Sequence, residues 1–393
     1  MTVRQRHPVR VVMLCHFIAA LAALGMPPFF ATILLDEFGS GRTELVGWFY
    51  VLPTLCTALA APWWGRFADR YGARPSLLRA QLGLALGFLL ASLAPSPLWF
   101  ALALVVQGLL GGTFAASNAY LATLTQGQGL ARSLNAMQGS ARAALVVAPV
   151  LFGWLMAWLT PLALYGYLAL LPLLAALLLL RLPAHGAGAA RVAKPPREAC
   201  ETGDRVAPAL LFLLQFGFSF ACVIGFPYFI ADAGARFDGL GRVQLAWLFS
   251  LPHLVYLLLA RPLGRWLQGW STLRALQLAL ALLALSYWGQ YQADDVTSLL
   301  LLRLLMGFAM TASFLMLHRL MSAASQVRAG HLFGRLDAAS KWAGVGAGLG
   351  AGVLSGLWGL ASPLLAAALL LLPLCFCLQT AIVSHSSSLS QRS

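Results

Sequence analysis

The chain has 393 residues, of which 60% are hydrophobic and only 10% are charged. A soluble protein carries about a quarter charged residues, so this composition excludes an ordinary soluble domain and indicates many membrane spans. The formal net charge of +14 does not indicate nucleic-acid binding, because the basic residues are dispersed along the chain rather than gathered in one patch.

Twelve apolar segments recur along the chain, and each is long enough to span a membrane as a helix. About 20 helical residues cross the roughly 30 Å hydrocarbon core of a bilayer, whereas an open sheet would leave backbone groups unpaired in lipid. The sequence therefore predicts an all-α polytopic membrane protein with spans at 11–35, 45–65, 76–95, 98–123, 134–157, 162–181, 208–232, 243–264, 273–291, 297–321, 332–357 and 361–383.

The N-terminus carries Arg4, Arg6 and Arg10 ahead of an apolar run from Val11 to Leu35. This run is too long for a signal peptide and lacks a small-residue cleavage site, so we interpret it as the first span. Most Lys and Arg residues lie in the termini and in one alternating set of loops, which is the positive-inside pattern. We therefore expect a multi-pass protein of the bacterial inner membrane with both termini in the cytoplasm.

One long polar connection divides the spans into two groups. Residues 183–206 contain several Pro, Gly and basic residues, a composition typical of a flexible cytoplasmic linker. The sequence therefore predicts a six-helix bundle over 1–182 and another over 207–383. The serine-rich residues 384–393 are expected to form a disordered cytoplasmic tail.

The two groups of spans repeat each other at a shift of 199 or 200 residues. The shift aligns Gly25–Phe29 with Gly225–Phe229, Gly65-Arg66 with Gly264-Arg265, Gln107-Gly108 with Met306-Gly307, and Arg142 with Lys341. Two halves in parallel repetition are a known transporter architecture, in which substrate binds near the membrane midplane. The repeat therefore predicts a transporter.

A charged segment with glycines follows the second predicted span. Its Gly65, Asp69, Arg70, Gly72 and Arg74 resemble the loop between helices 2 and 3 of the major facilitator superfamily. The resemblance implies that family's twelve-helix fold, alternating access by rocking of two halves, and a loop that helps to lock the outward-facing state. The alternative is a loop that only sets membrane topology.

The fifth predicted span carries Ala144, Ala148, Pro149 and Gly153. This spacing resembles the small-residue ladder of exporters in the superfamily, although alanine and Phe152 replace two glycines. Small residues four apart let helices approach closely, and the proline bends the helix. The pattern favours efflux over uptake.

Three basic residues, Arg142, Arg303 and Lys341, lie inside predicted spans. A charged residue at the centre of a span costs about 2.5–3.5 kcal/mol on insertion scales, so it normally faces a cavity or a partner. We expect these cations to contact an anionic or polyhydroxylated substrate. The alternative for Lys341 is a helix salt bridge with Asp337. Antiporters of the superfamily often carry such an Arg on helix 4, where this chain has Leu104.

Further polar side chains at membrane depth are candidates for the substrate cavity, although each could instead join two helices by a hydrogen bond. They are Gln107, Asn118, Gln138, Gln215 and Tyr256.

Scarce acidic and histidine side chains are the candidates for proton coupling, because desolvated carboxylates and imidazoles can carry protons. They are Asp337, Asp232, Asp36, His16 and His253. The alternatives are solvated helix ends for the carboxylates and hydrogen-bonded packing for the histidines.

No phosphate-binding loop of the Gly-x-x-x-x-Gly-Lys-Ser/Thr type occurs, and the six cysteines lack zinc-site spacing. We therefore expect no cofactor or metal and no enzymatic activity, with a proton gradient as the energy source. The sequence predicts a monomeric, lipid-embedded, proton-coupled exporter of a small polar or anionic molecule, with a siderophore slightly ahead of a sugar or drug. The alternatives are an uptake permease of the same fold and a non-transporting membrane sensor or assembly protein.

Overall fold

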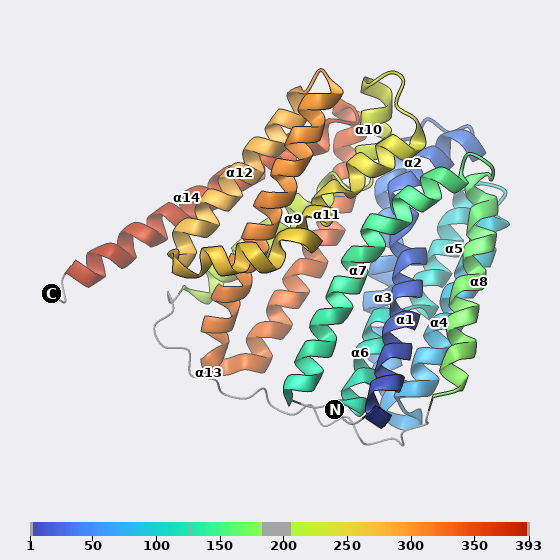
Figure 1. The fold of residues 1–393 in the computed structure, drawn as a ribbon. Helices are drawn as coiled ribbons and strands as arrows, with labels where there is room; N and C mark the ends of the chain where they lie inside the picture. The colour runs from blue at the N-terminus through green and yellow to red at the C-terminus, as the bar shows by residue number, and fades with distance from the viewer. Residues whose placement is uncertain (1–2, 126, 183–205, 391–393) are drawn as a thin grey trace. The chain divides into compact units, whose positions relative to one another are not determined.

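The structure, a computed structural model, describes residues 3–125, 127–182 and 206–390 (Figure 1). These ranges are almost entirely helical and contain no β-strand. Ten of their helices are long and apolar enough to cross a membrane, or eleven when a bent pair is counted as one span. The chain is therefore an all-α polytopic membrane protein, as the hydropathy pattern predicts.

The chain divides into two compact units. The first comprises Met1–Pro196 and the short segment Arg242–Ala246, and the second comprises Arg197–Gly241 and Trp247–Ser393. The expected linker at 183–206 lies almost entirely outside the described residues, so the predicted domain limits stay a prediction.

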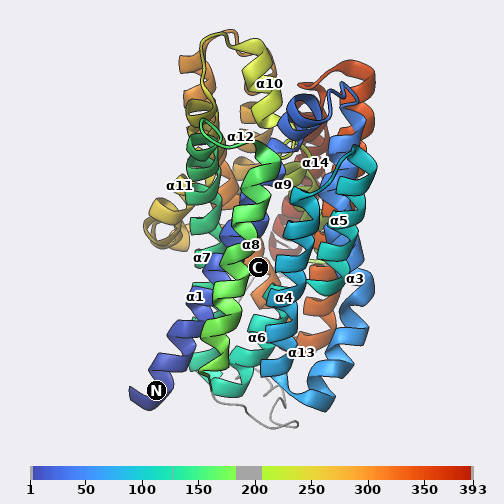
Figure 2. The same ribbon diagram turned by 90° about the vertical axis from the view of Figure 1, so that its right-hand side faces the viewer.

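The first unit contains eight α-helices and a broken connection after the first of them. Within this unit α4 packs against α8, and α1 packs against α7 (Figure 2). The elements are α1 Val3–Gly25, η1 Pro27–Phe29, α2 Phe30–Thr32, η2 Ile33–Glu37, α3 Glu44–Tyr71, α4 Ala73–Ser92, α5 Pro97–Leu110, α6 Thr113–Leu124, α7 Gly127–Leu155 and α8 Pro161–Leu180.

The second unit contains the remaining helices. Within it α13 packs against α9 and α12, and α12 packs against α14. The elements are α9 Pro208–Ile224, α10 Phe229–Arg236, α11 Arg242–Trp266, η3 Leu267–Gly269, α12 Thr272–Gln292, α13 Val296–Trp358 and α14 Ser362–Ser390.

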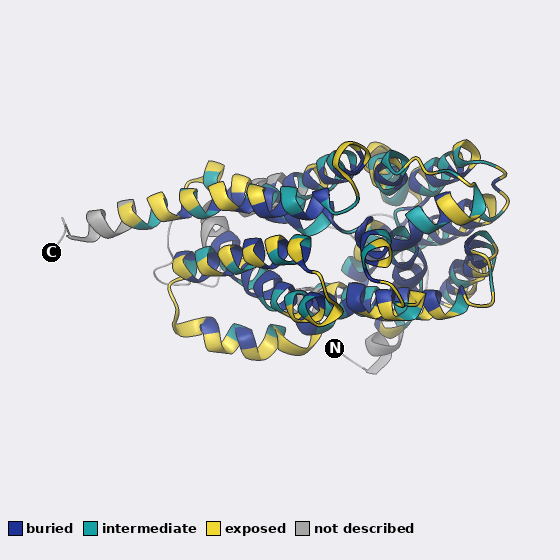
Figure 3. Cartoon of the chain, turned by 90° about the horizontal axis from the view of Figure 1, so that it is seen from above, coloured by how far each residue is buried: buried dark blue, intermediate teal, exposed yellow. Residues whose placement is uncertain are grey.

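Burial follows the helix faces in both units. Buried residues lie on the sides that meet neighbouring helices, whereas exposed residues run along the outer sides (Figure 3). Many of the exposed residues are large and apolar, such as Leu177, Phe376 and Trp358. Apolar outer faces are expected of helices whose solvent is lipid.

Three predicted spans are broken near a glycine, and the first of them is the span at 11–35, where α1 ends at Gly25 and η1 begins at Pro27. The span predicted at 98–123 ends as α5 at Leu110 and restarts as α6 at Thr113, with Gly112 at φ +86°, a left-handed conformation that favours glycine. The side chains of Thr57, Trp64 and Arg79 donate to the four carbonyls at this break, those of residues 108–111. The span predicted at 208–232 bends by 46° between α9 and α10.

Three predicted boundaries are wrong. The charged turn predicted at Gly65–Arg74 is mostly helix, because residues 65–71 contain no proline, and α3 runs to Tyr71, where Gly72 ends it. The connection predicted between 321 and 332 is also helical, since it contains no proline, and it lies within α13, which has 63 residues in all. The ribbon of α13 descends and then ascends (Figure 1), so its two limbs run in opposite directions. Residues 384–390, predicted to be disordered, continue α14.

The predicted span at 332–357 lies in the second limb of α13 and is not among the eleven candidate spans of the described residues. Its glycines and Lys341 lower the mean hydropathy of this limb.

Candidate functional site

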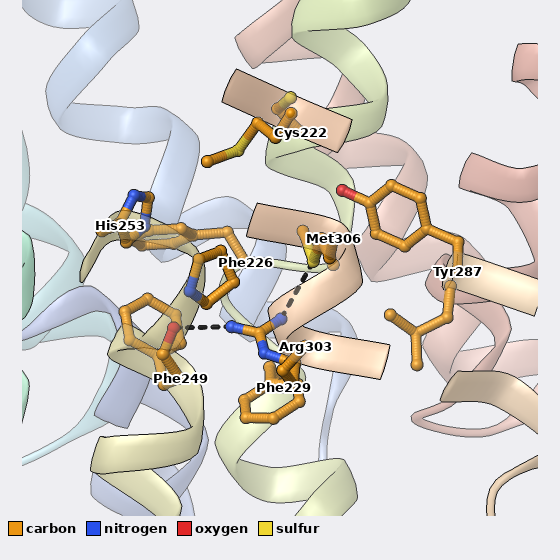
Figure 4. A pocket seen from close by; sticks show the side chains of 12 residues that line it. Cys222, Phe226, Phe229, Phe249, His253, Tyr287, Arg303 and Met306 are labelled. Atoms are coloured by element: carbon orange, nitrogen blue, oxygen red, sulfur yellow. Dashed lines mark hydrogen bonds between the residues drawn. The ribbon is translucent and has the colours of Figure 1, made fainter. Parts of the chain in front are cut away.

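A small cavity inside the second unit is the candidate functional site. Its volume is about 30 Å³, which is room for about two water molecules. Aromatic and sulfur-containing side chains from α9–α13 form much of its wall, and Figure 4 shows the guanidinium of Arg303 among them. Arg303 carries the one permanent charge among these described lining residues, and the imidazole of His253 is a second polar group.

The guanidinium of Arg303 is held by two backbone carbonyls of α11, next to Pro252. Pro252 has no N–H, so it cannot donate to the carbonyl of Leu248, four residues earlier. Arg303 Nε donates to this carbonyl at 2.9 Å, and Nη2 donates to the carbonyl of Phe249 at 2.6 Å. The ring centroid of Phe229 lies 4.0 Å from Cζ of Arg303, which is a cation–π contact. The proline thus creates an acceptor that the buried arginine uses.

A buried ion pair adjoins Arg303 through Gln290. The carboxylate of Asp232, which is 3% exposed, lies 2.6 Å from Nη2 of Arg236 one turn along α10. Arg236 also donates to three carbonyls at the end of α12, including that of Gln290, where a helix dipole favours a cation. The side-chain Oε1 of Gln290 lies 3.5 Å from Nη1 of Arg303. Gln290 therefore joins the two arginines.

The first unit repeats this helix crossing without the charge. A Cβ added to Gly108 would lie 2.9 Å from Pro53 Cα, and one added to Gly307 would lie 2.8 Å from Pro252 Cα. The two glycine–proline contacts are 199 residues apart, so the packing confirms the repeat. The counterpart of Arg303 in the first unit is the buried Leu104.

The counterpart of Phe229 also has different surroundings in the first unit. Phe29, its counterpart in the aligned block, is fully buried, and the adjacent Phe30 packs edge-on against Phe49 and Phe100, with ring centroids 6.0 and 5.9 Å away. The first unit therefore fills this region with aromatic side chains, whereas the second unit has a charged cavity there.

Equivalent polar contacts join the first and fifth predicted spans of each half. His16 Nδ1 on α1 lies 2.9 Å from Ser140 Oγ on α7. At a shift of 199 and 200 residues, Gln215 Nε2 on α9 donates to Ser340 Oγ on α13 at 2.7 Å and also to Ser219 Oγ at 3.2 Å. His16 Nε2 is buried and has no partner among the described residues.

The two predicted cations Arg142 and Lys341 lie beside these contacts. Arg142 is half-buried two residues after Ser140, and Lys341 is exposed directly after Ser340. Asp337, the alternative partner of Lys341, lies outside the side chains that the structure describes. The substrate role of both cations stays a prediction.

The remaining cavity candidates are dispersed. Gln107 Oε1 is buried without a partner among the described residues, whereas Asn118 and Gln138 are exposed. The ring of Tyr256 packs against Phe314, 5.6 Å away. None of these side chains lines the Arg303 cavity.

Asp36 is an exposed proton-coupling candidate of the first unit. Its carboxylate lies 2.6 Å from Nη2 of Arg242, which also donates to the carbonyl of Met156 at 3.0 Å. Arg242 begins the short segment that groups with the first unit. Asp36 is therefore ion-paired and partly exposed, whereas Asp232, His16 and His253 are buried.

The residues of the predicted gating loop are separated at the end of α3. Gly72 has φ +96° and ends the helix. Asp69 and Gly65 are exposed, and a Cβ added to Gly65 would meet nothing within 4 Å among the described residues, so Gly65 makes no close helix contact there. Arg74 donates to the carbonyls of residues 179 and 180 at the end of α8. Arg70 lies exposed beside Tyr71.

The small residues of α7 form a contact face in the first unit. Ala144 and Ala148 are fully buried. A Cβ added to Gly25 of α1 would lie 2.5 Å from Cβ of Ala148, and one added to Gly153 would lie 2.9 Å from the Arg242 carbonyl oxygen. Pro149 lies within this stretch of α7. The face permits α1 to approach α7 closely.

The broken, repeated helices agree with the comparisons to known proteins. The family model of the Major Facilitator Superfamily matches residues 12–238, more than half of the chain. The chain belongs to the Major Facilitator Superfamily. Its relatives in the superfamily are transporters and not enzymes.

Curated relatives match part of the chain. A staphyloferrin B transporter of Staphylococcus aureus (strain NCTC 8325 / PS 47) is 29% identical over 151 residues, which cover 38% of this chain and 36% of that protein. The multidrug resistance protein MdtG of Citrobacter koseri is 36% identical over 113 residues, which cover 28% of this chain and 27% of that protein. The chain thus spans only about a third of the length of these relatives.

Solved structures match nearly all of the chain and show its fold. The human organic anion transporter MFSD10 (TETRAN) has a TM-score of 0.67 at 20% identity, covering 96% of this chain and 100% of that chain. A bacterial homologue of the iron transporter ferroportin, solved in an inward-facing state, has a TM-score of 0.70 at 16% identity and covers 96% and 99%.

Sequence reasoning missed Arg236, Gln290 and Phe229 as members of the site. Arg236 follows the predicted end of its span at 232 and therefore falls in a predicted loop. Its spacing of four residues from Asp232 was the available signal for an ion pair. Nothing in the local sequence marks Gln290, because its role depends on the ends of α12 and α10 meeting.

Proposed function

We propose that this member of the Major Facilitator Superfamily is a proton-coupled exporter that moves a small polar or anionic molecule out of the cytoplasm. It sits in the bacterial inner membrane with both termini in the cytoplasm, and a siderophore is the preferred cargo ahead of a sugar or a drug. The substrate and the surrounding lipid are its partners, and the protein works as a monomer.

The observation that carries the proposal is the matched polar chemistry of the two units. His16–Ser140 and Gln215–Ser340 join equivalent helices, and a basic residue follows each serine within two positions. Repeated halves of secondary transporters supply equivalent helices to the transport path. Polar side chains kept at the same depth in both repeats therefore support contact with a polar cargo.

The direction and the cargo rest on sequence similarity. The matching relatives include a staphyloferrin B transporter and multidrug resistance proteins, which support export and give a siderophore or a drug as cargo. The small-residue face of α7, with buried Ala144 and Ala148, supports the same direction.

Proton coupling rests on the buried titratable groups and on the chain's lack of a nucleotide-binding motif. One charge that crosses 100 mV yields about 2.3 kcal/mol, enough to drive a concentration ratio of nearly fifty per proton. His16 has an unpartnered, buried Nε2 among the described residues, and Asp232 is buried beside Arg236. We propose these two groups as the proton carriers.

A comparison of metabolites in cells and medium tests the proposal. A strain that lacks the gene and the same strain complemented with it are grown with abundant iron and with scarce iron. The metabolites of the cells and of the medium are then profiled by mass spectrometry. Export predicts a compound that accumulates in the deletion cells and falls in their medium, more strongly when iron is scarce. A compound that stays in the medium because deletion cells fail to take it up shows uptake and overturns the proposed direction.

A further inference from the structure

The charges around the Arg303 cavity do not balance. Arg303 and Arg236 contribute two cations that are linked through Gln290, and Asp232 contributes one carboxylate. That carboxylate is paired with Arg236, and no acidic side chain of the described residues lies within 4 Å of Arg303. The cluster therefore carries a net charge of +1 in a buried place, which is costly unless an anion completes it.

The guanidinium keeps bonding capacity on the side that faces the cavity. A guanidinium has five N–H groups in a fixed fork. Nε and Nη2 each donate to one carbonyl of α11, while Nη1 has only a 3.5 Å contact with Gln290 Oε1 and a 3.3 Å contact with Met306 Sδ. Thioether sulfur is a weak acceptor. The Nη1–Nη2 end of the fork is therefore poorly satisfied, and this end is the one that binds a planar oxyanion with two parallel hydrogen bonds.

The size and the wall of the cavity limit what completes the cluster. A volume of about 30 Å³ has room for about two water molecules, which is similar to the room that the two oxygens of one carboxylate group need. Phe226 and Phe249 line the cavity with apolar surface (Figure 4), and Met310 adds to this surface. In such a wall the attraction between a guanidinium and a carboxylate is stronger than in water.

We propose that the Arg303 cavity binds one carboxylate group of the transported molecule, end-on to Nη1 and Nη2. The proposal rests on the proposed transport function and names the chemical group that its cargo presents to the second unit. Phe229 positions the guanidinium by stacking its ring against it. Gln290 contacts Arg303 through its side chain and Arg236 through its carbonyl, and so spaces the two arginines.

Binding of a carboxylate fragment to the purified full-length protein tests the site without any knowledge of the cargo. Acetate and acetamide have the same shape but differ in charge, and each is titrated at constant ionic strength while the thermal unfolding midpoint is followed. Wild-type protein is expected to show a saturable rise in the midpoint with acetate and none with acetamide. Arg303→Gln is expected to bind acetate at least tenfold more weakly.

Arg79→Gln is the matched control. Arg79 also donates to two backbone carbonyls and stacks on an aromatic ring, that of Trp64 at 3.7 Å, but it lies in the first unit and lines no part of the cavity. Its loss should leave the acetate response unchanged. If Arg303→Gln fails to fold, Arg303→Lys, which keeps the charge but loses the fork, is expected to weaken acetate binding at least threefold.

The proposal is overturned by equal responses to acetate and acetamide, by an acetate response that persists in Arg303→Gln, or by unchanged acetate affinity in Arg303→Lys. The result is separable from the test of export. A strain phenotype without acetate binding leaves the exporter standing and removes this site. Acetate binding that depends on Arg303, without any exported compound, keeps the site and removes the exporter.

Discussion

Pro252 and Arg303 are expected to be energetically coupled through the carbonyl of Leu248. With Pro252 in α11, this carbonyl has no helical N–H donor, and Arg303 Nε bonds it at 2.9 Å. Replacing Arg303 by Met then leaves a buried carbonyl unpaired. In the Pro252→Ala background, the new N–H of residue 252 can donate to Leu248, so the loss of Arg303 should cost less.

The expected coupling follows from one charged hydrogen bond. Bonds to charged groups contribute about 1.5–3 kcal/mol in soluble proteins, whereas interhelical bonds in membranes reach only about 1.7 kcal/mol. We therefore expect a coupling of about 1–2 kcal/mol between the two positions. The cost of burying the guanidinium cancels, because the charge is removed on both sides of the cycle.

A double-mutant cycle measures this coupling. Unfolding free energies of wild type, P252A, R303M and the double variant are compared by titration with SDS in mixed micelles. The matched control combines P252A with Arg79→Met, which lies in the other unit and should be additive. Additivity of P252A and R303M within about 0.5 kcal/mol would refute the account of how α11 holds the arginine.

Three further predictions concern packing, capping and substrate contact. Gly307→Ala places a Cβ 2.7 Å from Val255 Cβ and should destabilise the protein by about 1–3 kcal/mol. Gly344→Ala, whose Cβ meets nothing within 4 Å, should not destabilise it. Equal losses of unfolding free energy in SDS titrations would contradict the close contact of Gly307 with α11. Asp295 caps α13, and hydrogen bonds from residue 298 lower the pKa of its carboxyl. The stabilisation that the Asp295 carboxylate contributes is therefore fully present above the ordinary pKa of 3.8 and is lost as pH falls through the lowered pKa. The unfolding free energy of Asp295→Ala should therefore be lower than that of wild type at pH 7 and equal to it in strong acid. Arg142→Ala and Lys341→Ala should each abolish export from cells while membrane insertion, measured by blotting, is retained; normal export by both would remove the two cations from the substrate path.

The fold was predictable because it depends on properties that local sequence carries. Lipid requires every backbone group to be paired within helices, so apolar length alone indicates spans. The sequence repeat also appears in the packing, because Gly108 contacts Pro53 in the first unit as Gly307 contacts Pro252 in the second. The predicted boundaries failed in stretches that contain no proline. The run from residue 322 to 335 has no proline and stays helical in α13.

The site was only partly predictable, because its chemistry depends on contacts between distant elements. Arg303 was recognisable as a charge inside a span. Its partners are two carbonyls of α11 and the side chain of Gln290, and neither leaves a pattern in the sequence near residue 303. Asp232 was recognisable as a carboxylate at the end of a predicted span. Its pairing with Arg236 depends on the helix α10, whereas the sequence predicted a loop after residue 232.

The central claim is that outward movement of a small anion is coupled to protons. The most direct measurement uses everted inner-membrane vesicles that hold an acidic interior and a pH-sensitive dye, with the compound found by metabolite profiling added outside. The account predicts uptake of the compound into the vesicles together with loss of the proton gradient, and neither effect in vesicles without the protein or when the gradient is dissipated beforehand. Uptake that leaves the gradient unchanged and persists after its dissipation would contradict it.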